Sequence, residues 1–140
     1  MRAHDAYDPA LIRRVLTETR SIALVGASAN PARPSHHVMA FLLERGYRVT
    51  PVNPGLAGQT LLGQPVVARL ADLAEPVDMV EIFRSSDAAG GVVDEALALP
   101  WRPRFIWMQV GVRDAAAAAR AEAAGCVVVM DRCPMIEVFR

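Results

Sequence analysis

The chain has 140 residues, a length that suits one domain with a substantial core. Hydrophobic residues make up 53% and charged residues 21%, which excludes an intrinsically disordered chain, and no apolar run approaches the roughly 20 residues that cross a bilayer. The formal net charge is zero, so nothing favours a nucleic acid as partner. The N-terminus lacks the apolar segment of a secretion signal, and we expect a cytoplasmic protein without membrane association.

The first third of the chain predicts two rounds of helix and strand. Asp8 and Pro9 have the character of an N-cap and a first helical residue, and the apolar spacing continues the helix to about Thr19. Residues 21–25 form a short apolar run that ends at Gly26, which is typical of a strand buried on both faces. Residues 35–45 predict a helix that stops at Gly46, and residues 48–52 a second strand.

The pattern continues to the end of the chain. The segment 61–69 is weaker, with a short edge strand at 65–67. Strands are predicted over 79–83, 105–109 and 126–130. Helices are predicted over 87–99 and 114–124, the second capped by Asp114, and one more helical turn after Pro134. Strands that alternate with helices predict a single α/β domain over residues 1–140, a three-layer Rossmann-like fold. Its mostly parallel sheet would have about five or six strands, with helices on both faces.

Small, polar residues follow each strand, at the sheet edge where open parallel sheets bind ligands. Gly26 would let the backbone approach a ligand, and Ser28 with the helix start near Ser35 could donate to a pyrophosphate. Only one glycine of the dinucleotide fingerprint is present. Asn53 stands where a nicotinamide-cofactor protein usually has a carboxylate, which disfavours that cofactor. All 15 basic residues are arginine, so lysine chemistry is excluded and Arg33 is a candidate phosphate ligand.

Six short motifs, in this order, resemble those of the stand-alone CoA-binding domain proteins. They are Val25-Gly26-Ala27-Ser28-Ala29-Asn30-Pro31-Ala32-Arg33-Pro34-Ser35, Pro51-Val52-Asn53-Pro54, Gly63-Gln64-Pro65-Val66, Val80-Glu81-Ile82-Phe83-Arg84, Trp107-Met108-Gln109-Val110-Gly111 and Val129-Met130-Asp131-Arg132-Cys133. This family is similar to the N-terminal domain of the succinyl-CoA synthetase α subunit. The resemblance extends from about Ser21 to Glu137.

The resemblance implies coenzyme A, or an acyl-CoA, as the ligand and assigns residues to it. The loop that receives the phosphates would comprise Gly26, Ala27, Ser28, Asn30 and Arg33. The adenine and ribose would be bordered by Pro51, Val52, Asn53 and Pro54. The remaining contacts would come from Phe83 and Arg84 in the pocket lining and from Gln109 and Gly111 beside the pantetheine arm. Gly55 replaces the lysine that often follows the second-strand Asn-Pro pair, which would weaken phosphate binding or shift it to Arg33.

No catalytic or metal-binding set is apparent in the sequence. His36 and His37 are adjacent, so they point in different directions and do not have metal-ligand spacing. Cys133 could meet the thiol of bound CoA, although an ordinary half-buried thiol is the simpler interpretation. We therefore expect a non-catalytic carrier, sensor or regulatory module. A partner-dependent subunit of a ligase-like complex and, less readily, an NAD(P)-binding oxidoreductase remain alternatives, and a homodimer or another protein partner stays open.

Overall fold

A five-stranded parallel sheet forms the centre of the protein. The computed structural model describes residues 4–139. The strands are β1 (Ser21–Val25), β2 (Arg48–Val52), β5 (Met79–Ile82), β6 (Phe105–Met108) and β7 (Val127–Val129), and they lie in the order β2-β1-β5-β6-β7. All of their pairings are parallel. After β1 the chain adds β2 on one side, and it then adds β5, β6 and β7 on the other side, so the strand order reverses at β1. Open parallel sheets bind ligands near such a reversal.

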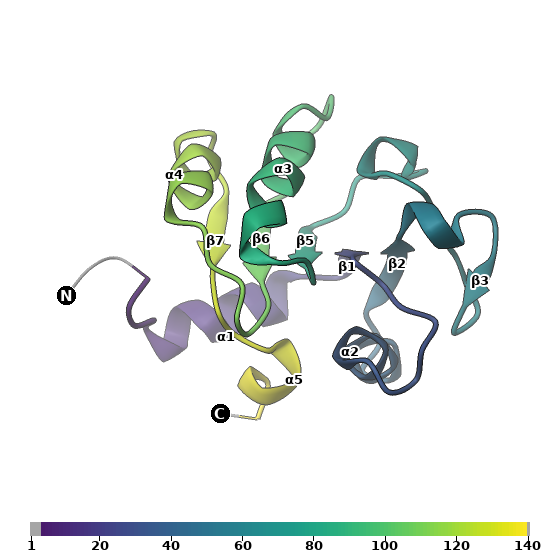
Figure 1. The fold of residues 1–140 in the computed structure, drawn as a ribbon. Coiled ribbons are helices and arrows are strands. Elements are labelled where there is room, and N and C mark those ends of the chain that lie inside the picture. The colour runs from purple at the N-terminus through teal and green to yellow at the C-terminus, as the bar shows by residue number, and fades with distance from the viewer. Residues whose placement is uncertain (1–3, 140) are drawn as a thin grey trace.

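Helices cover both faces of the sheet, as Figure 1 shows. On one face lie α1 (Pro9–Glu18), α2 (Pro34–Glu44) and the short α5 (Pro134–Glu137), and on the other lie α3 (Ser86–Leu97) and α4 (Ala115–Ala123). The three-layer Rossmann-like architecture predicted from the sequence is therefore confirmed. Within residues 4–139, no helix is long and apolar enough to span a bilayer.

The capping residues act as the sequence predicts. Asp8 Oδ1 accepts a hydrogen bond from the backbone N–H of Ala10 at 2.8 Å, and α1 begins at Pro9. Asp114 Oδ1 does the same for Ala117 at 3.0 Å at the start of α4. These bonds satisfy N–H groups that have no partner inside a helix. The predicted helices and strands accordingly differ from the observed ones by only one or two residues at each end.

The segment after β2 differs from its prediction. In place of an edge strand over 65–67, β4 (Gln64–Pro65) pairs antiparallel with β3 (Thr60–Leu61), and Val67 alone makes a parallel bridge to Val52. Two prolines explain why the pairing stops there. Continuing it would require an N–H at Pro51 in β2 and at Pro65 opposite, and proline has none. The bridge nevertheless brings residues 67–69 beside the end of β2, next to the predicted ligand site.

Two hydrophobic clusters hold the layers together, one on each face of the sheet. The cluster beneath α3 and α4 is built from small residues: Ala89, Val93, Ala117 and Ala121 are fully buried. The cluster beneath α1, α2 and α5 contains the large side chains Phe105 and Trp107. The indole Nε1–H of Trp107 donates to the backbone oxygen of Arg132 at 2.9 Å and so ties β6 to the segment before α5. The sheet is thus packed between two hydrophobic layers, and the loops at its carboxyl edge follow these buried strands.

Candidate ligand-binding site

Gly26 ends β1 in a conformation that other residues adopt with strain. Its φ is +91°, and a Cβ built there would lie 2.3 Å from the backbone oxygen of Phe83. The Gly26 N–H donates to the oxygen of Val52 at 3.1 Å, which links the ends of β1 and β2. Glycine is therefore required here both for its positive φ and for the close approach of the loop after β5. Gly26 also lines two hollows at the carboxyl edge of the sheet.

Asn53 holds the loop after β1 against the end of β2. Its Nδ2 donates to the backbone oxygen of Ala27 at 2.7 Å, and its Oδ1 accepts from the N–H of Gly55 at 2.8 Å. Both ends of the amide are thus engaged in positioning backbone, and the short 3₁₀ turn Pro54–Leu56 begins immediately after it. The family resemblance implies that Asn53 borders the adenine and ribose, which stays a prediction; the structure shows that its amide positions the backbone of two loops.

Two hollows meet over Gly26 and Asn53, which line both. One has a volume of about 390 Å³ and lies toward β2 and α3, and the other, of about 350 Å³, lies toward the start of α2. Both lie at the carboxyl edge of the sheet, and we call the two together the edge groove. Each volume lies within the range of small-molecule sites, roughly 300–1,000 Å³. The predicted site residues that line the edge groove are Gly26, Ala27, Ser28, Arg33, Val52, Asn53, Pro54, Phe83 and Arg84.

Two arginines of the edge groove contribute positive charge without an ion pair to the described carboxylates. Arg33 and Arg84 are exposed, and neither forms an ion pair with a carboxylate of residues 4–139. The N-terminus of α2 also faces the groove, because Pro34 and Ser35, the first two residues of this helix, line it. The positive end of a helix dipole and its unpaired N–H groups favour an anion at such a position. The groove is therefore suited to a phosphate-bearing ligand.

Four predicted residues do not line the edge groove. Pro51 is buried within β2, and Asn30 lies further out, where its Oδ1 accepts from the N–H of Ala32 at 3.0 Å. Gln109 and Gly111 follow β6, one strand beyond Phe83. The N–H of Gly111 donates to Asp131 Oδ1 at 2.7 Å, so this loop is braced against the end of β7. Their predicted place beside a pantetheine arm stays a prediction.

The prediction also missed residues on the β2 side of the groove. Ala68, Arg69, Val92 and Glu95 line the hollow there. The Val67 bridge brings the first two to the sheet edge, and a strand prediction for 65–67 was the only signal in the sequence for this. Arg69 pairs with Asp72 at 3.2 Å, and Glu95 Oε1 accepts from the N–H of Leu70 at 2.8 Å. Both charged side chains are thus partly committed to the local structure.

A buried carboxyl group lies in the sheet near the site. Glu81 of β5 is fully buried, neither carboxyl oxygen has a hydrogen-bond partner in the described structure, and desolvation raises its pKa from 4.5 to about 8. In the register of the sheet it lies between Leu24 and Trp107. The Oε1 of Gln109, at the end of the neighbouring strand, is also buried without a partner. An unpaired carboxyl in such a place is expected to be protonated at neutral pH.

The remaining candidates lie outside the edge groove. Cys126 and Cys133 are both buried and not disulfide-bonded, and Cys133 lines neither hollow. Burial also raises the pKa of the Cys126 thiol. Among residues 4–139, no three His, Cys, Asp or Glu side chains are grouped so that they could hold a metal ion. The reaction of Cys133 with a CoA thiol stays a prediction without support from its position.

The sheet is open and parallel, a glycine turn follows β1, and a helix N-terminus and two arginines lie at the carboxyl edge. These features are typical of Rossmann-like nucleotide-binding domains. Residues 20–138 match the model of a family described as "CoA binding domain". The chain belongs to this family, as its sequence motifs indicated.

The chain is also similar to one curated relative and to several solved structures. The chain is 36% identical over 122 residues to the uncharacterized protein YneT of Bacillus subtilis (strain 168), covering 87% of each chain. It is 42% identical to the protein of the solved structure "cell-free ID.343" from Thermus thermophilus, with a TM-score of 0.89 over 96% of this chain and 98% of that one. The dinucleotide-forming acetyl-coenzyme A synthetase 1 of Ca. Korarchaeum cryptofilum is 24% identical, with a TM-score of 0.63 over 78% of this chain and 25% of that one. The last comparison concerns the fold alone.

Proposed function

We propose that this protein binds coenzyme A or an acyl-CoA in the edge groove and acts as a non-catalytic carrier, sensor or regulatory module. The observation that carries the proposal is the groove itself: two hollows that meet over the close-approach backbone of Gly26, with the unpaired guanidinium groups of Arg33 and Arg84 beside it. Membership of the CoA-binding domain family supports the same ligand.

The two halves of the groove suit the two halves of the ligand. The hollow toward β2 has apolar walls from Val52, Pro54 and Val92, which fit an adenine ring, with Arg84 at hand for a ribose phosphate. The pyrophosphate would lie over Gly26, where the N-terminus of α2 offers a positive dipole. The pantetheine arm would then leave past Phe83, toward the loop after β6.

The chemistry of the lining supports binding without catalysis. The described residues that line the edge groove include no histidine or cysteine, and its one carboxylate, Glu95, accepts the Leu70 N–H. Ser28 has no adjacent base, and its Oγ accepts from the N–H of Asn30 at 3.1 Å. General acid–base or nucleophilic catalysis needs a positioned pair of such groups. A partner protein that supplied them would turn the same groove into half of an active site.

Isothermal titration with CoA, acetyl-CoA, dephospho-CoA and NAD tests the proposal. We expect saturable binding of the CoA species, weaker binding of dephospho-CoA, and no heat with NAD. Arg33→Gln should weaken CoA binding about tenfold, because charge-assisted hydrogen bonds contribute about 1.5–3 kcal/mol. Arg102→Gln, at an exposed arginine outside the groove, is the matched control and should change nothing.

Two results would overturn the proposal. Binding of NAD alone would favour the oxidoreductase alternative. No binding of any CoA species by the folded protein would leave the partner-dependent subunit, which a pull-down from native extract would then have to support with a stoichiometric partner.

A further inference from the structure

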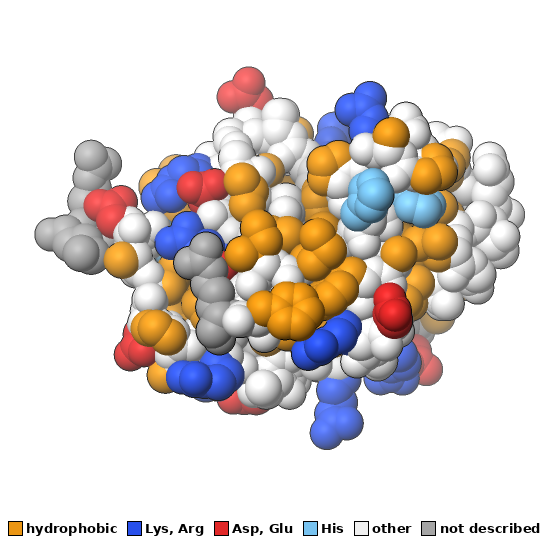
Figure 2. Space-filling view, turned by 90° about the horizontal axis from the view of Figure 1, so that it is seen from below, with side chains coloured by type: hydrophobic (Ala, Val, Ile, Leu, Met, Phe, Trp, Pro, Cys, Tyr) orange, Lys and Arg blue, Asp and Glu red, His pale blue; other side chains and the backbone are white. Residues whose placement is uncertain are grey.

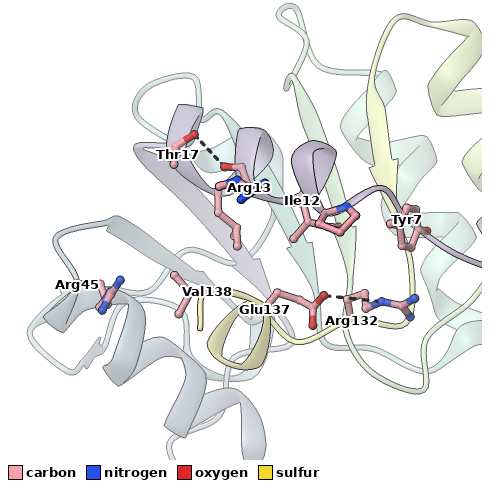
Figure 3. Close-up of a pocket in the computed structure, with 10 residues that line it drawn as sticks. Tyr7, Ile12, Arg13, Thr17, Arg45, Arg132, Glu137 and Val138 are labelled. Carbon is pink, nitrogen blue, oxygen red and sulfur yellow. Dashed lines mark hydrogen bonds and ion pairs between the residues drawn. The ribbon is translucent and has the colours of Figure 1, made fainter. Parts of the chain in front are cut away.

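A second groove runs along the opposite side of the molecule, between α1 and α5. Figure 3 shows Ile12, Arg13 and Thr17 of α1 on one wall, Arg132, Glu137 and Val138 on the other, and Arg45 at one end. The cavity has a volume of about 350 Å³. Its floor is apolar, because Ile12 and Leu16 are buried there and Val138 closes it from the side of α5. It shares no lining residue with the edge groove.

The cavity continues into a second, wider hollow of about 570 Å³. The two share Leu16, Thr17, Arg45 and Val138, so they form one elongated depression, which we call the α1–α5 groove. The wider hollow reaches Arg20 and Arg48, at the amino ends of β1 and β2. This end of the groove therefore lies at the sheet edge opposite to Gly26.

Most of the arginines that line this groove form no ion pair with the described carboxylates. Within residues 4–139, ion pairs with carboxylates are formed by Arg14, Arg69, Arg104, Arg113, Arg120 and Arg132. In the groove, four do not pair with any carboxylate of residues 4–139: Arg13, Arg20, Arg45 and Arg48. The chain as a whole is neutral, with 15 basic and 15 acidic residues, so this is a local excess of positive charge. The one acid in the lining, Glu137, lies 3.9 Å from Arg132.

Arg45 is held at the junction of the two hollows. Its guanidinium lies over the ring of Phe41 at 5.7 Å and over that of Phe139 at 5.5 Å. Such cation–π contacts orient the guanidinium group through its face. The N–H donors, which lie in the plane of the guanidinium, remain able to bind another partner. In Figure 2, which views this side of the molecule, hydrophobic side chains gather in the middle of the face, with basic and acidic side chains around them. The α1–α5 groove thus combines an apolar floor with an oriented cation, and a ligand that fits it needs both an apolar part and a negative charge.

We propose that the α1–α5 groove binds an amphipathic anion, with an unbranched alkyl chain between α1 and α5 and a terminal carboxylate or phosphate against Arg45, Arg20 and Arg48. The apolar cavity is of a size that takes a small-molecule ligand. Charge complementarity favours this occupant over a second copy of the chain, since a symmetric contact would place the two arginine clusters against each other. The proposal does not depend on CoA binding.

Isothermal titration with decanoate and with decyl phosphate tests the proposal. Both anions are used below their micelle concentrations, and saturating CoA is present. Saturable binding of either anion supports it, and the tighter of the two identifies the head group. Decanol has the alkyl chain without the negative charge, and inorganic phosphate has the charge without the chain. Each should bind at least about tenfold more weakly than the amphipathic anions. No saturable binding of either anion, or equal binding of decanol, would overturn it.

Substitutions test whether the anion binds in the α1–α5 groove. Arg45→Gln changes an exposed residue and should weaken the binding of the anion about tenfold, without lowering the melting temperature. Val138→Trp should fill the channel and abolish binding, and its melting temperature shows whether it folds. Arg102→Gln removes an unpaired exposed arginine outside both grooves and is the matched control. Equal losses in Arg45→Gln and Arg102→Gln would mean a nonspecific charge effect and would overturn the proposal.

Discussion

Replacing Glu81 by glutamine should remove a large pH dependence of stability. The carboxyl is fully buried without a hydrogen-bond partner, and desolvation raises its pKa from 4.5 to about 8. Because the pKa in the folded state is above that in the unfolded state, the contribution of this group is fully present below pH 4.5. It is lost as the pH rises through the folded-state pKa. At about 1.36 kcal/mol per pKa unit, the whole loss is roughly 5 kcal/mol.

The difference between Glu81→Gln and the parent isolates this effect. Groups common to both proteins cancel, among them Glu18, whose pKa is lowered by its hydrogen bond with Arg104. Between pH 5 and pH 8, the free energy of unfolding of the variant should rise relative to the parent by roughly 3 to 4 kcal/mol. The sign of this free-energy difference at pH 5 also depends on the glutamine, which buries an additional N–H₂ donor. The change of the difference with pH is therefore the quantity that tests the pKa of Glu81.

Urea unfolding followed by circular dichroism at pH 5, 6, 7 and 8 measures this difference. Glu44→Gln, at an exposed position of α2, is the matched control for replacing a carboxyl by an amide. A Glu81→Gln difference that stays constant from pH 5 to pH 8 would refute the reasoning, since it would mean that the carboxyl is ionised or paired in the native protein.

Three further predictions concern the edge groove. Gly26→Ala should destabilise the protein by roughly 3 kcal/mol or more in urea unfolding, because the new Cβ would lie 2.3 Å from the backbone oxygen of Phe83. Gly46→Ala, at a similar φ of +94° but with open space around the Cβ, should cost only about 1–2 kcal/mol. Equal losses in the two variants would argue against the close approach at Gly26. Asn53→Ala removes two hydrogen bonds to backbone and should cost about 2 kcal/mol by the same assay, whereas a neutral result would mean that water replaces them. Arg84→Gln should weaken CoA binding about tenfold in calorimetry and change stability by less than about 0.5 kcal/mol; an unchanged affinity would place the phosphates elsewhere.

The order of elements could be predicted from the sequence because local signals were unambiguous, and with it the sheet edge at which the candidate ligand residues gather. Asp8 and Asp114 cap helices that begin where predicted, and the apolar run that ends at Gly26 is a strand buried on both faces. The carboxyl ends of parallel strands necessarily meet at one edge, so the residues after β1, β2 and β5 converge. Most of the predicted ligand residues therefore line one groove.

What the sequence could not predict depends on contacts between distant segments. The single bridge between Val67 and Val52 brings Arg69 to the edge groove, and Pro51 and Pro65 stop this pairing from extending toward the amino ends of the two segments. The isolation of Glu81 depends on every element packed around it, which no local pattern encodes. The α1–α5 groove likewise depends on how a four-residue helix sits against α1 and on which arginines find carboxylates.

A crystal structure of the protein with CoA added in slight excess would test most directly whether the edge groove binds CoA. We expect the pyrophosphate over Gly26, within hydrogen-bonding distance of the N-terminus of α2, and the adenine beside Val52 and Pro54. CoA bound in the α1–α5 groove, or an empty edge groove in crystals of a complex that calorimetry shows to be saturated, would contradict this expectation.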